Sequence, residues 1–338
     1  MCPADTDAEV GAESRIDALM HAYQGAVPGA GVAVLKHGAS VVSRAYGLAD
    51  LENRIAATAA TNYRLASVSK QFTAAAILLL AEDGRLSIDD PVRKWLPELP
   101  DAAAASVIRH LLTHTSGLID FEDLIPDGTT GQLRDADVLG LLAAENRGYF
   151  PPGTHYRYSN SGYSLLASIA ARASGMDFAS FLRRRIFEPL GMQETVAFEA
   201  GISAVAHRAF GYSRVQDSWT RADQSLTSAT LGDGGIYSSL DDLAKWDAAL
   251  GEGGLLRPES LRLAFLPATP TDDPAVQYAF GWRITGDSVW HSGETTGFRN
   301  VIVRFPERRL TVIVLTNRDD PAPYPMALEI ADVFLPPR

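Results

Sequence analysis

A serine and a lysine that lie three residues apart, Ser67 and Lys70, are the first pair in the chain with the makings of a catalytic site. They open the apolar segment 67–82, whose hydrophobic residues recur at helical spacing. Residues three apart share a helix face, about 5–6 Å between Cβ atoms, so an amine at 70 reaches a hydroxyl at 67. A serine becomes a strong nucleophile when such a neighbouring base takes its proton.

This spacing by itself carries little weight, because Ser-x-x-Lys is expected by chance about once in a chain of this size. The chain has four lysines, and Lys70 alone follows a serine by three residues. The alternative interpretation is a capped helix with a lysine in solvent.

A second candidate group is Tyr158 with Asn160, between a turn-rich Pro-Pro-Gly loop and a predicted helix that starts near Ser161. A tyrosine on such a loop can act as a base in its phenolate form, which nearby cations favour, and an amide both donates and accepts hydrogen bonds. The alternative is that Asn160 or Ser161 caps the helix and Tyr158 packs on the surface.

The third group is His291-Ser292-Gly293, at the end of a predicted strand. A glycine at 293 allows close approach of a substrate to the backbone, and the N–H of Glu294 is then available to an oxyanion. His291 could bind the polar tail of a substrate. A turn that contains a satisfied histidine is the alternative.

The elements that must position these groups are strands at both ends of the chain and helices between them. The clearest hairpin joins 300–305 to 310–315, and a second covers 29–46. We therefore predict an α/β (α+β) fold in which residues 1–84 and 276–338 build one domain around an antiparallel sheet. Residues 85–275 form a mostly helical insertion, with the active site at the interface.

In this order, the three groups resemble the serine β-lactamase and penicillin-binding-protein superfamily, in its class C-like branch. That superfamily carries Ser-x-x-Lys, then Tyr-x-Asn, then Lys- or His-x-Gly. The resemblance extends over nearly the whole chain, through segments 28–34, 111–118 and 234–239 and the last hairpin. It implies the β-lactamase/transpeptidase-like fold.

The resemblance also implies a role for each residue. Ser67 is acylated, while Lys70 and Tyr158 share the proton transfers of acylation and deacylation. Asn160 positions Lys70 and the acyl chain, and the backbone N–H groups of Ser67 and Glu294 bind the oxyanion. Which of Lys70 and Tyr158 holds the proton at rest is a coupled question that the sequence leaves open. No cofactor and no metal is implied.

One departure from the class C β-lactamases is His291, which stands where those enzymes have a lysine. Histidine is mostly neutral at pH 7, so it attracts the carboxylate of a β-lactam poorly. Arg299 is a candidate for a carboxylate clamp in its place, or for an ion pair with an acidic neighbour; the sequence favours neither. His114 is interpreted as a structural residue of a loop near the site.

The net charge of −11 excludes the basic footprint of a nucleic-acid-binding protein. No apolar run reaches the length of a membrane span, and no secretory signal is visible. Cys2, the single cysteine, is either the lipid-bearing residue of a lipoprotein of the cell envelope or periplasm or a chance cysteine of the terminus, so the sequence leaves a location there or in the cytoplasm open. The oligomeric state stays open.

We therefore expect a serine hydrolase that acts through an acyl-enzyme on a small ester, amide or short D-peptide. The leading prediction is a β-lactamase-related carboxylesterase or D-stereospecific peptidase with weak or no β-lactamase activity. The alternatives are a D-alanyl-D-alanine carboxypeptidase and a sensor that stays acylated without turnover.

Overall fold

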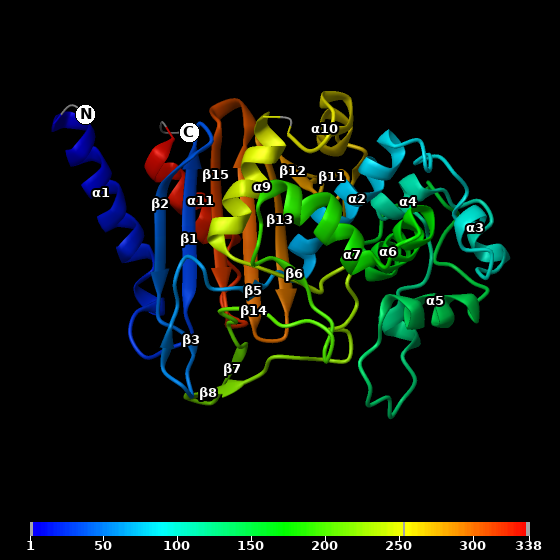
Figure 1. Cartoon of the computed structure of the whole chain (residues 1–338), viewed down its shortest axis with the longest axis horizontal. Helices are drawn as coiled ribbons and strands as arrows, with labels where there is room; N and C mark the ends of the chain where they lie inside the picture. Colours follow the sequence, from blue (N-terminus) through cyan, green and yellow to red (C-terminus); the bar gives the residue numbers. More distant parts are fainter. Residues whose placement is uncertain (1–2, 253, 336–338) are drawn as a thin grey trace.

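The computed structural model describes residues 3–252 and 254–335, and the side chains of 11–251 and 254–335. Its centre is an eight-stranded antiparallel sheet in the order β10-β11-β12-β13-β14-β15-β1-β2, which runs from the helical side of the molecule to the far edge (Figure 1). The strands are β1 (Ala30–Lys36), β2 (Ala39–Tyr46), β10 (Thr269–Pro270), β11 (Gln277–Tyr278), β12 (Arg283–Thr285), β13 (Ser288–Thr295), β14 (Phe298–Phe305) and β15 (Leu310–Thr316). The predicted fold class is confirmed.

The strands of this sheet alternate between two apolar cores, as the two-residue period of a β-strand requires. On β1, Val32 and Val34 belong to the core under helices α1 (Pro3–Leu19) and α11 (Tyr324–Phe334), whereas Ala33 and Leu35 belong to the larger core on the other face. Strand β15 pairs with β1 in register from Ala30↔Thr316 to Lys36↔Leu310. The two ends of the chain therefore meet in the middle of one sheet.

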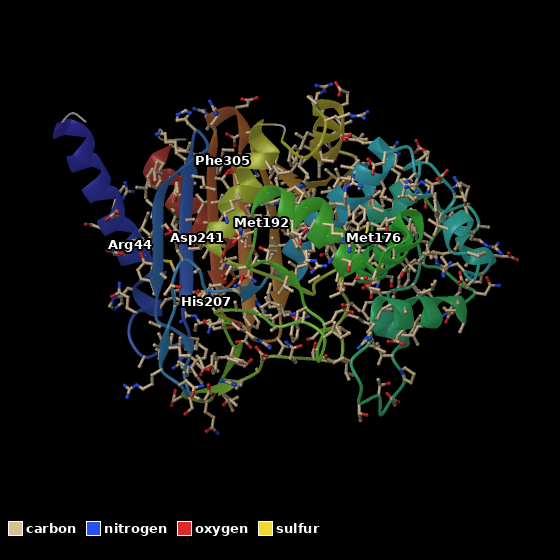
Figure 2. All side chains as sticks on the ribbon, viewed as in Figure 1. Arg44, Met176, Met192, His207, Asp241 and Phe305 are labelled. Atoms are coloured by element: carbon tan, nitrogen blue, oxygen red, sulfur yellow. The ribbon has the colours of Figure 1, made fainter. Side chains whose placement is uncertain are left out.

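Helix α1 lies along the outer edge of the sheet, where the burial of Ile16 and two ion pairs hold it (Figure 1). Arg44 on β2 donates to Glu13 at 3.2 Å and to Asp17 at 2.6 Å. Figure 2 shows Arg44 at this edge. Both pairs are partly exposed, so each contributes about 1 kcal/mol or less.

Helices and short turns make up most of the other side of the molecule. The α-helices there and on the inner sheet face are α2 (Lys70–Glu82), α3 (Val92–Trp95), α4 (Ile108–Leu112), α5 (Asp135–Ala143), α6 (Asn160–Ser174), α7 (Phe178–Leu182), α8 (Glu188–Leu190), α9 (Leu240–Glu252) and α10 (Pro258–Phe265). The 3₁₀ turns are η1 (His21–Tyr23), η2 (Ala66–Ser69), η3 (Asp101–Ala103), η4 (Phe121–Leu124) and η6 (Pro306–Arg308), and η5 (Arg183–Phe187) is a π-helix.

The remaining strands form three small sheets. They are β3 (Leu48–Asp50) with β4 (Ile55–Ala56), β7 (Tyr212–Val215) with β8 (Ser218–Arg221), and β5 (Tyr63–Arg64) and β6 (Val196–Ala197) on either side of β9 (Ile236–Ser238). No single helix among the described residues is long and apolar enough to span a membrane. One bent pair, Asn160–Ser174 with Phe178–Leu190, reaches that length and composition only in combination.

The division of the chain into two domains stays a prediction. Helix α9, which lies inside the predicted insertion 85–275, packs against β1 and β15. Figure 1 shows α9 in front of the sheet. Cys2, on which the lipoprotein expectation rests, lies outside the described residues.

The predicted start of the helix at Ser67, the candidate nucleophile, differs from the structure. The segment from Ser67 was expected to begin as an α-helix, but residues 66–69 form the tight turn η2, and α2 begins at Lys70. Ala66 has a φ of +50°, in the left-handed region that costs a residue with a Cβ free energy. Ser67 therefore follows a strained residue and a sharp turn, and stays only half-buried.

Gly293 on β13 is the point where the sheet meets this turn. A Cβ at 293 would lie 2.0 Å from the Leu65 carbonyl oxygen and 3.1 Å from the backbone nitrogen of Val68. The predicted reason for this glycine was a close approach of substrate. The structure corrects this: the backbone of the turn that carries Ser67 occupies the space.

Gly293→Ala is expected to destabilise the protein by at least about 3 kcal/mol, because the backbone carbonyl of Leu65 cannot move aside without shifting the turn. Gly140→Ala on α5 is the matched control, since no heavy atom lies within 4 Å of its added Cβ. That change should be neutral or stabilising by about 0.5–1 kcal/mol. Chemical denaturation measures both, and equal effects would contradict this packing.

Candidate active site

The amine of Lys70 is the centre of the site. Lys70 Nζ lies 2.9 Å from Ser67 Oγ, 2.8 Å from Asn160 Oδ1 and 3.0 Å from the Asp233 carbonyl oxygen. The side chain is fully buried. Because Asn160 Oδ1 and the Asp233 carbonyl can only accept, a neutral amine would give them its two N–H groups and turn its lone pair toward the Ser67 hydroxyl.

The amide of Asn160 has its orientation set from both sides. Its oxygen accepts from Lys70, and its Nδ2 donates to Glu122 Oε1 at 2.8 Å. Its backbone N–H, at the start of α6, donates to Asp120 Oδ2 at 2.8 Å. The loop before η4 therefore holds the beginning of α6 against Lys70.

Tyr158 lies beside Lys70, and its part in proton transfer stays a prediction. Lys70 Nζ is 5.0 Å from the centre of the Tyr158 ring. The centres of the His114 and Tyr158 rings are 4.3 Å apart, and the two ring planes are tilted against each other. His114 also holds the loop, because its carbonyl accepts from Arg157 N and its Nδ1 accepts from Ser159 N. This geometry agrees with a structural role for His114.

The ring of His291 is buried and already bonded at both nitrogens. Nδ1 donates to the Ser292 carbonyl at 2.6 Å, and Nε2 accepts from the Tyr278 hydroxyl at 3.0 Å. Burial, with the charges of Arg283 and Lys70, holds the pKa of His291 well below its ordinary value. His291 therefore has no free ring nitrogen for the predicted contact with a substrate. Its ring instead orients the Tyr278 hydroxyl.

Glu294 lies on a stretch of β13 with one open edge. Strand β12 pairs only with Ser288–Trp290, whereas β14 pairs with β13 as far as Thr295. The turn η2 packs against this part of β13. Ser67 and Glu294 therefore lie on two segments that pack against each other, and the role of their backbone N–H groups as oxyanion donors stays a prediction.

Arg299 is already engaged with its own strand end. Its guanidinium donates to the carbonyls of Thr295 at 2.7 Å and Phe298 at 2.8 Å, and lies 3.8 Å from Glu294 Oε2. Of the two interpretations left open by the sequence, the structure favours the pair with an acidic neighbour. It does not present Arg299 as an unpaired clamp.

Arg283 is a cation near the site that the sequence analysis missed. Its guanidinium carbon lies 5.4 Å from the Tyr158 ring centre and 5.9 Å from that of Tyr278. Its Nε is buried without a partner, and within residues 3–252 and 254–335 no hydrogen bond or ion pair engages its side chain. Only the pairing of β12 with its neighbours brings this arginine to the site.

Two acidic residues behind Lys70 were also missed. Asp233 supplies the carbonyl that accepts from Lys70, and Asp135 holds the same turn by accepting from the backbone N–H groups of Leu231 and Gly232 at 3.0 and 3.2 Å. Burial and the Asp233 carboxyl raise the pKa of Asp135 to about 7. Groups of three or more metal-binding side chains are absent from the described part of the chain.

A protein-family model matches most of this chain. The family model described as "Beta-lactamase" matches residues 12–333. The chain belongs to this family.

Two curated relatives and one solved structure illustrate the likeness. Penicillin-binding protein 4* of Bacillus subtilis (strain 168) is 33% identical over 84% of this chain and 66% of its own length. D-aminopeptidase of Gluconobacter oxydans (strain 621H) is 30% identical over 90% of this chain and 58% of its own length. The D-amino acid amidase of Ochrobactrum anthropi SV3, complexed with L-phenylalanine amide, superposes with a TM-score of 0.81 at 26% identity, over 96% of this chain and 97% of its own.

The chain thus spans between 58% and 66% of the length of these two curated relatives. It covers nearly all of the amidase structure. The parts of the site described above lie inside the matched residues 12–333.

The raised pKa of Asp135 makes a prediction about stability. The Asp135 carboxyl keeps its proton up to about pH 7 in the folded state, whereas in the unfolded chain it releases the proton near pH 4. Its contribution to the free energy of unfolding is therefore full at low pH and is lost as the pH rises through 7. Between pH 5 and pH 8, the free energy of unfolding of wild type should fall by on the order of 2 kcal/mol more than that of Asp135→Asn. Urea titrations at each pH measure the difference.

The exposed Asp127 provides the control for this comparison. Wild type and Asp127→Asn should give parallel curves of stability against pH. A parallel curve for Asp135→Asn as well would contradict the raised pKa.

Proposed function

We propose that this protein is a serine hydrolase that acylates and deacylates Ser67. The proposed substrates are amides and short peptides of D-amino acids, together with simple esters. The observation that carries the proposal is the single amine of Lys70, bonded at once to Ser67, Asn160 and the Asp233 carbonyl. The D-aminopeptidase and D-amino acid amidase relatives support the substrate class.

In acylation, neutral Lys70 takes the proton of Ser67 while Oγ attacks the substrate carbonyl carbon. The backbone N–H groups of Ser67 and Glu294 stabilise the developing oxyanion. The tetrahedral intermediate then collapses, and the leaving amine or alkoxide receives a proton from the Lys70–Tyr158 pair. The product of this step is an ester of Ser67.

In deacylation, a water molecule attacks that ester from the side of Tyr158. The Tyr158 phenol passes its own proton to the neutral Lys70 amine as it takes the proton of the water, and Lys70 then gives a proton to Ser67 Oγ as the acid leaves. Asn160 keeps Lys70 in place through both steps, because its amide cannot turn without losing its bond to Glu122.

We expect β-lactams to be poor substrates. A neutral, buried His291 supplies no charge for the drug's carboxylate at the position where class C enzymes carry lysine. The unpaired Arg283 favours a second candidate function, a D-alanyl-D-alanine carboxypeptidase. Its guanidinium beside Tyr158 is suited to the C-terminal carboxylate of a peptide leaving group.

A substrate panel separates these functions. Wild type should hydrolyse p-nitrophenyl acetate and D-alanine p-nitroanilide at least about 100-fold faster than nitrocefin, and Ser67→Ala should abolish all turnover. Faster release of D-alanine from a D-Ala-D-Ala peptide than from either chromogenic substrate would instead establish the carboxypeptidase. Undiminished hydrolysis by Ser67→Ala would end the proposal.

A further inference from the structure

A cavity of about 630 Å³ lies where helices α9 and α10 meet the hairpin that joins β14 to β15. Figure 1 shows both helices beside the sheet. Leu250 of α9, Leu261 and Phe265 of α10 and Leu310 of β15 form apolar parts of its wall. Leu266, at the end of α10, also lines the cavity and is 59% exposed. The volume is typical of pockets that hold small organic molecules, and these walls suit a hydrocarbon group.

The cavity is separate from the active site. Arg304 of β14 lines it, whereas Asn300 of the same strand pairs with Gly293, which packs on the turn that carries Ser67. Four residues of strand correspond to about 13 Å. The residues that line the cavity, as far as the chain is described, include none of the catalytic candidates. A ligand bound there leaves the active site open to substrate.

Arg304 brings a buried charge to this cavity. The residue is only 7% exposed, and its Nε donates to Asp247 Oδ1 at 2.6 Å while its Nη2 donates to the Asp247 carbonyl at 3.3 Å. Asp247 Oδ1 accepts a further bond from Thr311 Oγ1 at 2.8 Å. Within residues 3–252 and 254–335, Arg304 Nη1 makes no hydrogen bond. The guanidinium therefore keeps donors for an acceptor that the protein does not supply.

The charges that line the cavity favour an anion. Arg262 and Arg309 line it together with Arg304, and Asp247 is the one acid among the described residues that do so. Asp247 is already neutralised by Arg304. Because a planar guanidinium can give a carboxylate two parallel N–H bonds, an arginine in an apolar cavity is well suited to a carboxylate ligand.

Gly251 of α9 keeps the space beside this guanidinium open. A Cβ at 251 would have one neighbour within 4 Å, Arg304 Nη2 at 3.8 Å. The φ of Gly251 lies outside the left-handed region, so its backbone does not require a glycine. Since Gly251 itself lines the cavity, a longer side chain at this position would extend into it and over the arginine.

We propose that this cavity is a second binding site, specific for a small amphiphilic carboxylate such as the anion of a medium-chain fatty acid. The carboxylate binds Arg304, and the hydrocarbon chain lies between α10 and the β14–β15 hairpin. Binding then depends on both parts of the ligand. It strengthens with each methylene that leaves water, and it requires the negative charge.

The first test is calorimetry of wild type with three probes, decanoate, octanoate and decanol, each below the concentration at which it aggregates. Decanoate should bind once per chain and about 10-fold more tightly than octanoate, because two more methylenes are buried. Decanol should bind at least about 10-fold more weakly than decanoate, since it lacks the charge that Arg304 meets. Absence of decanoate binding, or equal affinity for decanol, would overturn the proposal.

The variant Gly251→Leu tests the location of the site without removing any of its side chains. The added side chain should lower the affinity for decanoate at least about 10-fold, while leucine favours the helix and keeps the protein folded. Gly140→Leu on α5 is the matched control, because no heavy atom lies within 4 Å of its added Cβ and it is not among the lining residues. Undiminished binding to Gly251→Leu would place the ligand elsewhere and contradict the assignment.

The role of the arginine is tested by Arg304→Lys, which keeps the charge beside Asp247 but loses the guanidinium fork. Its affinity for decanoate should fall about 10-fold and its affinity for decanol should stay unchanged. If this variant does not fold, Gly251→Leu still decides the proposal. Equal losses for decanoate and decanol in a folded Arg304→Lys would contradict carboxylate recognition.

A second copy of this chain is the alternative occupant of the cavity, and sedimentation of wild type and Gly251→Leu distinguishes the two. The same mass for both proteins is expected if the cavity holds a small ligand. A wild-type dimer that Gly251→Leu dissociates would assign the cavity to an interface between copies and overturn the proposal.

Discussion

The interaction on which the rest of this structure depends is the three-way hydrogen bonding of one buried amine. Lys70 meets Ser67 from its own turn, Asn160 from the start of α6, and the Asp233 carbonyl from the turn before β9. These groups come from three segments far apart in the sequence. The sheet, α2 and α6 must all be in place before the amine has its partners, so the site exists only in the folded protein.

The surroundings of this amine decide which charges the site holds. Both buried histidines, His114 and His291, are kept neutral by burial and by neighbouring cations. His291 accepts from the Tyr278 hydroxyl and His114 from the backbone N–H of Ser159, so both orient neighbouring groups without carrying charge. The charges that reach the site lie at its edges. Arg283 stands on one side, over Tyr158, and Glu122 on the other, against Asn160. We interpret Arg283 as one source of specificity around a common acyl-transfer centre.

Much of this could be predicted from the sequence, because helical spacing pairs Ser67 with Lys70 and because alternating apolar strands at both chain ends predict the sheet. The rest depends on tertiary structure. A backbone carbonyl such as that of Asp233 leaves no mark on residue type, and Arg283 is brought in only by strand register. The sequence indicated that Gly293 lies where something approaches the backbone closely. It could not indicate that the Leu65 backbone does so, since the packing of β13 on η2 is a long-range contact.

The account's central claim is that Lys70 makes Ser67 nucleophilic, and pre-steady-state acylation tests it most directly. Wild type mixed with a p-nitrophenyl ester should release a stoichiometric burst of nitrophenol, and mass spectrometry should find the acyl group on the peptide that contains Ser67. Lys70→Met should slow that burst at least about 1000-fold while the protein stays folded. An undiminished burst in Lys70→Met, or an acyl group on another residue, would contradict the claim.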